Sequence, residues 1–286
     1  MPGNFRKYGT LFLASLCIAV TITELKGDDW EDRIRSLAYR IKRDSGSSRK
    51  FWNCIRWLED NMTERAGYSL YQFNWQQPFY PNIGVPFTSG MSSGSTIEAF
   101  TRAFQLSRDS RYLAKARMLL RGFFISIQES GFTLKSETGW WYEEFAAQHV
   151  QTPQILDGHI YALLGVHEYW TETKDDSALF IVNQGISALK HQLYLYDAGN
   201  GIVNYDRKGS IADQHYHELL VSLLKQLGQM TGDPDYYAYY RKWKEPLEQP
   251  YVIRMIRLGN RSGILLFALI TGLSFILFLL IRRFIN

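Results

Sequence analysis

Apolar side chains recur every three or four residues along most of the chain, which is the spacing of one face of an α-helix. Ile97, Phe100 and Phe104 follow this spacing, and so do the apolar residues of 160–164 and the leucines of 219–227. Long stretches that alternate between apolar and polar residues, which are typical of strands, are scarce. The pattern therefore predicts a mainly α fold.

A weak internal repeat of about 60 residues runs through the body of the chain. Its three copies cover residues 103–120, 166–183 and 224–243. Each copy is predicted to form a helix, a short polar turn with an aspartate, and a second helix. Asp109, Asp176 and Asp233 are the predicted N-caps of these second helices. Helical hairpins that recur at this interval predict an (α/α) toroid or solenoid, with loops facing a central cleft.

Residues 68–94 interrupt the helical pattern with aromatic residues, prolines and glycines. They predict irregular structure or a short β-hairpin before a helix that begins at Ser95. The expected division of the chain is a signal sequence or N-terminal membrane anchor at 1–25, a helical and aromatic-rich segment at 26–85, an (α/α) catalytic domain at 86–250, and a transmembrane helix at 262–283.

Both ends of the chain suggest contact with membrane lipid. Residues 264–281 are eighteen uncharged, mostly apolar residues, which is the usual length of a spanning helix, and two arginines follow directly. Residues 11–22 form a shorter apolar run after Arg6 and Lys7, as in a signal sequence. We expect a single-pass or two-pass membrane protein with its catalytic domain outside the cytoplasm. Three arginines between 254 and 261 argue for the opposite orientation.

Composition and charge exclude several classes of protein. The net charge is only +4 and the basic residues form no stripe, which disfavours nucleic acid as a partner and suits an anionic ligand. Two cysteines exclude a disulfide framework and a zinc site. Aromatic residues make up 15% of the chain, and they serve either core packing or a saccharide site.

The stretch "GWWYEEF" (139–145) surrounds a pair of glutamates with aromatic side chains. Trp140, Trp141 and Tyr142 would partly desolvate the carboxyl groups of Glu143 and Glu144, and desolvation raises the pKa of a carboxyl group. Such a group exchanges protons near neutral pH. The alternative is that both glutamates are solvated at a loop edge while the aromatic rings face the core.

The stretch "NYDRKGSIADQHYHELL" (204–220) carries more titratable side chains than an ordinary connecting loop. Tyr216 shares a helical face with the following leucines and lies at the N-terminal turn, where an anionic ligand is favoured. Tyr205 precedes it by a loop, so both hydroxyls would reach one pocket, and Arg207 would supply a cation. Alternatively, each tyrosine is a core ring. Asp157, in "TPQILDGHIYALLGVHEYW" (152–170), is expected to cap a helix.

Five stretches together, "SGMSSGSTIEAFTRAFQLSRDSRYL", "WWYEEF", "ILDGHIYALLGVHEYW", "YDAGNGIVNYD" and "HYHELL", resemble the C-terminal domain of D-glucuronyl C5-epimerases between Pro86 and Trp243. The resemblance implies an (α/α) toroid that converts D-glucuronate to L-iduronate in a polysaccharide such as a heparan sulfate-like glycan. It implies Glu144, Tyr205 and Tyr216 as catalytic residues. The chemistry of this reaction requires no cofactor and no metal.

The other expected site residues are substrate contacts. They are Arg207, His215, His217, Trp140, Trp141, Tyr142 and Asp157. The sequence departs from the family where Gln214 and His215 replace an aromatic–aspartate pair and where Glu218 and Leu219 replace a threonine-rich turn. Arg207 stands one residue earlier than the family's arginine. A homodimer is compatible with the sequence, which gives no further sign of it.

The chemistry of epimerisation explains the expected residue types. The hydrogen on C5 lies next to a carboxylate, so its removal gives an enediolate, and inversion needs proton-transfer groups on both faces of the carbon. Glu144 and Tyr216 are the predicted pair, with Tyr205 assisting. Three alternatives remain open: a polysaccharide lyase, a glycoside hydrolase using Glu144 with Asp157 or Asp213, and a membrane-attached glycan-binding protein without turnover.

Overall fold

A computed structural model describes residues 49–257 and 261–285 of the chain. The predicted N-terminal signal or anchor at 1–25 and the first part of the 26–85 segment lie outside the described residues. Nine α-helices are described: α2 (Arg49–Asp60), α3 (Gly90–Ser107), α4 (Arg111–Gly122), α5 (Leu156–Thr173), α6 (Asp176–Gln192), α7 (Gln214–Thr231), α8 (Pro234–Lys244), α9 (Tyr251–Arg257) and α10 (Arg261–Ile285). The prediction of a mainly α fold is confirmed.

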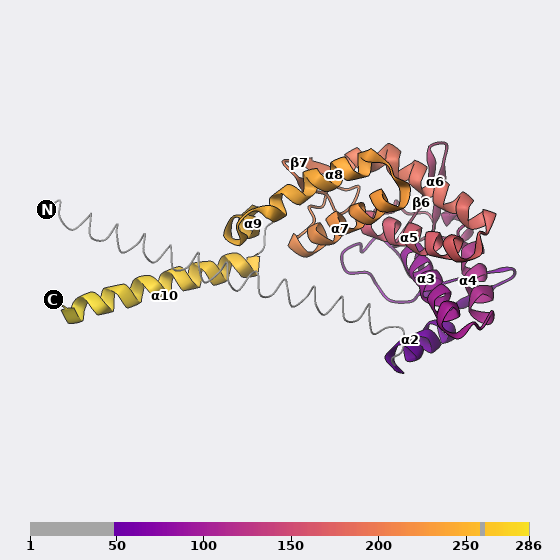
Figure 1. Ribbon diagram of the computed structural model, residues 1–286, viewed down its shortest axis with the longest axis horizontal. Coiled ribbons are helices and arrows are strands. Elements are labelled where there is room, and N and C mark those ends of the chain that lie inside the picture. The colour runs from indigo at the N-terminus through magenta and orange to yellow at the C-terminus, as the bar shows by residue number, and fades with distance from the viewer. Residues whose placement is uncertain (1–48, 258–260, 286) are drawn as a thin grey trace.

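Helices α3 to α8 form three consecutive hairpins that lie side by side (Figure 1). Helix α5 packs against both α3 and α7, so these three helices make an inner layer. Helices α4, α6 and α8 each return along the preceding inner helix and make an outer layer. The inner helices bury more of their side chains, as expected for the layer that is covered on both sides.

The three hairpins share one turn, made of a hydroxyl residue, a left-handed residue and an aspartate. These turns are residues 107–109, 173–175 and 231–233. In each turn the hydroxyl donates to the carbonyl four residues earlier and accepts the aspartate N–H. The middle residues, Arg108, Lys174 and Gly232, have φ of 59°, 57° and 70°. The repeat seen in the sequence is thus a repeated turn.

Of the three predicted N-caps of the outer helices, only Asp233 is confirmed, and the starts of α4 and α6 differ from the prediction. Asp233 accepts the N–H of Asp235 and caps α8 as expected. The cap of α6 is Asp175, because its side chain and not that of Asp176 accepts the first free N–H groups. Asp109 stands one residue before the N-cap position of α4 and accepts the N–H of Arg111.

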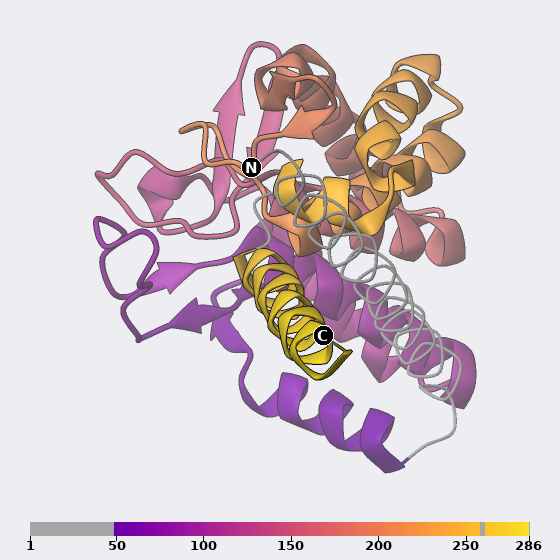
Figure 2. The same cartoon turned by 90° about the vertical axis from the view of Figure 1, so that its left-hand side faces the viewer.

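Four two-stranded antiparallel sheets accompany the helices, and several of them gather on one side of the body (Figure 2). Their strands are β1 (Thr63–Arg65) with β2 (Tyr68–Leu70), β3 (Gln72–Phe73) with β4 (Phe87–Thr88), β5 (Thr133–Ser136) with β6 (Gly139–Tyr142), and β7 (Asp197–Gly199) with β8 (Ile202–Val203). Three 3₁₀ turns complete the described structure, η1 (Ile127–Glu129), η2 (Leu193–Tyr196) and η3 (Glu245–Glu248).

Helix α3 begins at Gly90, five residues before the predicted start at Ser95. The Ser89 side chain accepts the N–H of Ser92 and caps the helix. Gly90 and Gly94, which obscure this start in the sequence, serve packing. A Cβ on Gly94 would lie 2.5 Å from the Cα of Ala162, and one on Gly165 would lie 1.9 Å from the carbonyl oxygen of Gly94. Helices α3 and α5 therefore approach each other closely where these glycines meet.

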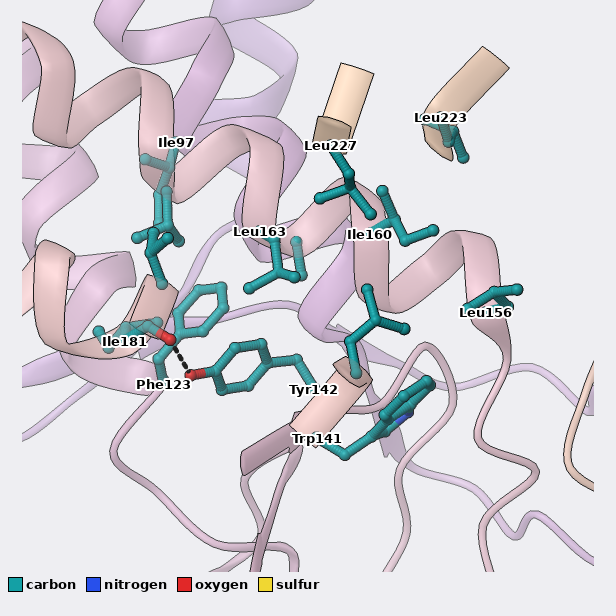
Figure 3. Packing of buried hydrophobic residues seen from close by; sticks show 14 of the residues in the cluster. Ile97, Phe123, Trp141, Tyr142, Leu156, Ile160, Leu163, Ile181, Leu223 and Leu227 are labelled. Carbon is teal, nitrogen blue, oxygen red and sulfur yellow. Dashed lines mark hydrogen bonds between the residues drawn. The ribbon is translucent and has the colours of Figure 1, made fainter. Parts of the chain in front are cut away.

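The core between the layers takes in side chains from strand β6 as well as from the helices (Figure 3). Tyr142 is fully buried, and its hydroxyl donates to the carbonyl of Ile181 in α6 at 2.6 Å. Its backbone N–H donates to Nδ1 of His159 in α5, whose Nε2 lies 3.1 Å from the carbonyl of Gly185. Burial lowers the pKa of His159 to about 4, so this ring is a neutral structural link.

Helix α10 extends away from the body at its C-terminal end (Figure 1). Leucines along it, such as Leu265, Leu269 and Leu273, are more than half exposed. The helix predicted for 262–283 is thus present. The transmembrane interpretation is not supported, because within the described ranges no helix combines the length and apolarity needed to cross a membrane.

Candidate active site

A cleft of about 430 Å³ lies where the segment after β6 meets the loop before α7. It is lined by Gln77, Phe79, Tyr80, Glu144, Phe145, Tyr205, Ser210, Ile211, Ala212, Asp213 and Tyr216. The three side chains predicted to be catalytic, Glu144, Tyr205 and Tyr216, are all among them. Segments about 60 to 70 residues apart in the sequence therefore contribute to one site.

The backbone around Glu144 is fixed by hydrogen bonds on both sides. Glu143 donates its N–H to Phe132 at 2.9 Å, and its carbonyl accepts the N–H of Gly90, the first residue of α3, at 2.7 Å. Thr88 and Ala146 exchange two hydrogen bonds of 2.9 Å. The segment is therefore pinned to the start of α3.

The two adjacent glutamates have different surroundings, as expected where extended chain sends successive side chains to opposite sides. The carboxyl of Glu143 is fully buried and accepts hydrogen bonds from the hydroxyl of Thr152 at 2.5 Å and the N–H of Gln154 at 3.1 Å. The carboxyl of Glu144 lines the cleft. The solvated alternative for this pair is therefore wrong.

Glu144 is only 8% exposed, and its Oε2 is buried without a hydrogen-bond partner. A buried polar atom without a partner is uncommon and unfavourable. Burial, with smaller contributions from the charges of Asp157 and Glu143, raises the pKa of Glu144 to about 8. The group can therefore gain or lose a proton near neutral pH, which suits a general acid or base.

The first turn of α5 lies directly behind Glu144. A Cβ on Gly158 would be 2.7 Å from the Glu144 Cβ and 2.8 Å from its Oε2, so only glycine fits there. Asp157 does not cap α5, whose N-cap is Ile155; it lies in the first turn and accepts the N–H of Gly158 at 3.0 Å. Burial raises the pKa of Asp157 to about 6, an effect that the hydrogen bond from the Gly158 N–H partly opposes.

Tyr205 and Tyr216 meet across the cleft, with ring centroids 4.7 Å apart. The backbone of Tyr205 is held by Leu156, which donates to its carbonyl at 3.1 Å. Tyr216 lies in the first turn of α7, and its N–H donates to the N-cap Asp213. Burial first, and then the carboxylates nearby, raise the pKa of both tyrosines above its ordinary value. Both hydroxyls therefore keep their protons at neutral pH.

Sequence reasoning missed Tyr80 and the buried Asp206. The Tyr80 hydroxyl donates to Asp206 Oδ2 at 2.7 Å, and the same carboxylate accepts from the hydroxyl of Ser210 at 2.9 Å. Asp206 also accepts the N–H groups of Lys208 and Ser210. These contacts shape the loop that carries Tyr205. Only the unusual density of aromatic residues around position 80 could have drawn attention to Tyr80.

Several expected substrate contacts lie elsewhere. Trp140 packs against Phe124 and Phe180, while Trp141 is buried and stacks on His159, with centroids 3.9 Å apart. Tyr142 belongs to the core described above. These rings are core or outer-layer residues because β6 alternates its side chains between α5 and α6.

The expected cation and one histidine also lie outside the cleft. His217 is fully buried, and its Nε2 lies 2.7 Å from the carbonyl of Trp243. Arg207 donates to Oε1 of Gln192 at 2.6 Å and faces a neighbouring hollow. His215 is exposed, with its ring 5.4 Å from that of Tyr216, and is the expected substrate contact that stands nearest the cleft.

The described lining of the cleft contains carboxyl and hydroxyl groups but no lysine or arginine. Proton transfer is therefore the chemistry that these side chains can perform best. Glu144 can accept a proton once ionised, and the two tyrosines can donate one or form hydrogen bonds to a developing negative charge.

The arrangement of (α/α) hairpins is similar to that of a solved sugar epimerase. The crystal structure of a sugar epimerase from a ruminal bacterium superposes with a TM-score of 0.51, over 82% of this chain and 59% of that one. At 14% sequence identity this likeness concerns the fold alone.

The family follows from the sequence match. The family model of the D-glucuronyl C5-epimerase C-terminus matches residues 63–245, which is more than half of the chain. The chain therefore belongs to the D-glucuronyl C5-epimerase family, as the resemblance suggested.

Two relatives illustrate this membership. A D-glucuronyl C5-epimerase of Caenorhabditis elegans is 28% identical over 214 residues, which are 65% of this chain and 33% of that protein. An uncharacterized protein of Methanocaldococcus jannaschii is 27% identical over 191 residues, which are 65% of this chain and 59% of that protein. The chain thus spans one third to three fifths of the length of these relatives.

Proposed function

We propose that the chain inverts C5 of D-glucuronate residues in a polysaccharide and so forms L-iduronate. The observation that carries this proposal is the buried Glu144, with its unpartnered Oε2, in one cleft with Tyr205 and Tyr216. Family membership supports the same reaction. The activity needs a base and an acid on opposite faces of one carbon, and the cleft offers both kinds of group.

In the proposed reaction the ionised Glu144 removes the C5 proton, and the electron pair moves onto the substrate carboxylate to give an enediolate. Tyr216 then donates its proton to the opposite face of C5, which restores the carboxylate with inverted configuration. Glu144 ends protonated and Tyr216 ends as a phenolate, so one proton must pass from Glu144 to Tyr216 to reset the site.

Tyr205 is suited to assist this sequence. Its ring contacts that of Tyr216, and the raised pKa keeps its hydroxyl protonated. A neutral hydroxyl can donate a hydrogen bond to the enediolate or to the Tyr216 phenolate. His215 lies at the exposed end of the same pair, where it can contact the substrate carboxylate.

Attachment of the protein to a membrane, with its catalytic domain outside the cytoplasm, stays a prediction of the sequence. Its support is the run of exposed leucines on α10. Separation of membranes from soluble protein, with and without residues 261–286, tests it. Full release of the complete chain by alkaline carbonate would contradict stable attachment.

The reaction is tested by proton exchange at C5. The purified chain is incubated in D₂O with an unsulfated polymer of alternating glucuronate and N-acetylglucosamine, and deuterium at C5 and new iduronate signals are followed by NMR. We expect both in the wild type and a loss of at least about 10²-fold in Glu144→Gln, the usual contribution of one acid–base group. Unsaturated chain ends would identify a lyase, and exchange that survives in Glu144→Gln would refute the assignment of the base.

A further inference from the structure

A second hollow, of about 380 Å³, lies on the other side of the loop that carries Tyr205. Arg207 and Lys208 line it, together with the exposed His149 and polar side chains such as Gln151 and Gln154. No acidic residue is among its described lining, whereas the cleft holds Glu144 and Asp213. The two neighbouring depressions therefore have opposite electrostatic character.

The loop that separates them is rigid because of Asp206. This fully buried carboxylate accepts hydrogen bonds from the Tyr80 hydroxyl, the Ser210 hydroxyl and two backbone N–H groups. Arg207 also donates its backbone N–H to the carbonyl of Pro153 at 3.0 Å. The loop thereby presents Tyr205 to the cleft and the next exposed side chains, Arg207 and Lys208, to the hollow.

Lys208 stands at the boundary between the two depressions. Its ammonium group lies 5.1 Å from the centroid of the Tyr80 ring, and Tyr80 lines the cleft. The nearby acidic groups are already engaged: Asp206 by its four hydrogen bonds, and Glu143 by Thr152 and Gln154 beneath the hollow. The charge of Arg207 therefore faces the hollow, and that of Lys208 lies at its edge, over the Tyr80 ring.

We propose that this hollow is an anion-binding subsite, in which Arg207 and Lys208 contact a carboxylate or sulfate group on a sugar that adjoins the one in the cleft. The inference rests on the proposed function for the identity of the polymer. It explains why an arginine expected beside the catalytic residues faces away from them: its charge orients the polymer, while the cleft holds the sugar that reacts.

A third hollow adjoins the second. It has a volume of about 450 Å³, shares His149 and Val150 with the second hollow, and contains Arg65. His149 has φ of 60°, an unfavourable backbone conformation for a residue other than glycine, at the junction of the two. Two adjoining hollows that both contain positive side chains suit a polyanionic chain better than a single sugar.

The test measures polymer binding and turnover separately. Binding of the unsulfated glucuronate polymer and of a sulfated counterpart is measured by calorimetry at two salt concentrations, for Arg207→Gln and Lys208→Gln. The charge-preserving Arg207→Lys and Lys208→Arg are compared, and Lys225→Gln on the exposed face of α7 is the matched control. C5 exchange is followed for the polymer and for a single glucuronide.

We expect each charge-removing variant to raise the Kd for the polymer about three- to tenfold and to weaken its salt dependence, as for partly exposed charge pairs. Lys225→Gln should leave Kd unchanged. The polymer's KM should rise more than that of the single glucuronide. A larger loss for the sulfated polymer would identify sulfate as the group bound, and equal losses would identify the carboxylate.

Unchanged affinity in both charge-removing variants would overturn the subsite, and the epimerase proposal would stand if exchange continued. The two proposals can also fail in the other order. Binding that depends on Arg207 and Lys208, without C5 exchange on either polymer, would keep the subsite and refute the proposed reaction.

Discussion

Replacement of Gly158 by alanine tests whether the backbone of α5 sets the position of Glu144. The added Cβ would lie 2.7 Å from the Glu144 Cβ, 2.8 Å from Oε2 and 3.2 Å from Cγ. Carbon atoms in contact prefer about 3.5–4.0 Å, so one of the two groups must move by roughly 1 Å. Helix α5 has little room to retreat, because Gly165 already touches Gly94 of α3. The Glu144 side chain is therefore the part expected to move.

Gly158→Ala is expected to lower both the stability of the fold and the rate of turnover. Overpacking of a buried site typically costs about 1–3 kcal/mol of unfolding free energy. A shift of 1 Å in a catalytic group can reduce the rate about 10²-fold. We therefore expect Gly158→Ala to unfold at lower urea concentration and to lose C5 exchange far beyond its loss of folded protein. Urea denaturation and the rate of deuterium uptake measure the two effects.

Gly228→Ala is the matched control. A Cβ there would lie 2.9 Å from the Tyr237 ring, so it also crowds a helix contact, but between α7 and α8 and away from the cleft. We expect it to lower stability without lowering exchange per folded molecule. Turnover of Gly158→Ala within a factor of two of the wild type would refute the reasoning, since Glu144 would then not depend on this contact.

The remaining predictions concern protonation, the turn repeat and the core. The pKa values of Glu143 and Glu144 rise from 4.5 to about 8 on folding, so the folded chain binds protons more readily than the unfolded chain. The free energy of unfolding should therefore fall as pH rises from about 4.5 to 8. Glu144→Gln should make this fall shallower in urea titrations at pH 5 and 8, and an equal slope would contradict the raised pKa. In the wild type, kcat/KM should rise with pH through about 8 as Glu144 ionises; a falling profile would make Glu144 the acid instead of the base. Gly232 has φ of 70° and open space around it, so Gly232→Ala should lower the free energy of unfolding by about 1 kcal/mol through backbone conformation alone. An unchanged urea midpoint would contradict this. Tyr142→Phe should lower the free energy of unfolding by about 1 kcal/mol, because it removes a buried hydrogen bond to the Ile181 carbonyl. Exchange per folded molecule should persist, and loss of exchange in a stable variant would indicate that Tyr142 takes part in the site.

The parts of the fold that could be predicted depend on local sequence. The hairpin turns can be predicted from the sequence because their hydrogen bonds form within a few residues of one another. In the third turn, for example, the hydroxyl of Thr231 donates to the carbonyl of Leu227 and accepts the N–H of Asp233. Helix boundaries were less certain where glycines serve packing. The start of α3 was placed too late because Gly90 and Gly94 read as loop residues, although both accommodate neighbouring elements.

The site could be predicted where the family resemblance fell on residue types that can transfer protons. Glu144, Tyr205 and Tyr216 stood out as proton-transfer groups, and the structure places all three in one cleft. The side of the loop on which Arg207 lies could not be predicted. It is set by the buried Asp206, whose partner Tyr80 stands 126 residues earlier in the sequence than Asp206. The tryptophans before Glu144 suggested a saccharide platform, yet the alternation of β6 sends Trp141 into the core.

These contacts also explain how one short segment serves both structure and chemistry. Glu143 fastens the segment to Thr152 and Gln154 just before α5, and α5 in turn places Gly158 against Glu144. The same α5 segment holds the backbone of Tyr205 through Leu156. The start of α5 thus positions both Glu144 and the assisting Tyr205. Tyr216 comes from α7 and reaches this support through its ring contact with Tyr205, so a small error in the position of Tyr205 would also slow the proposed transfer.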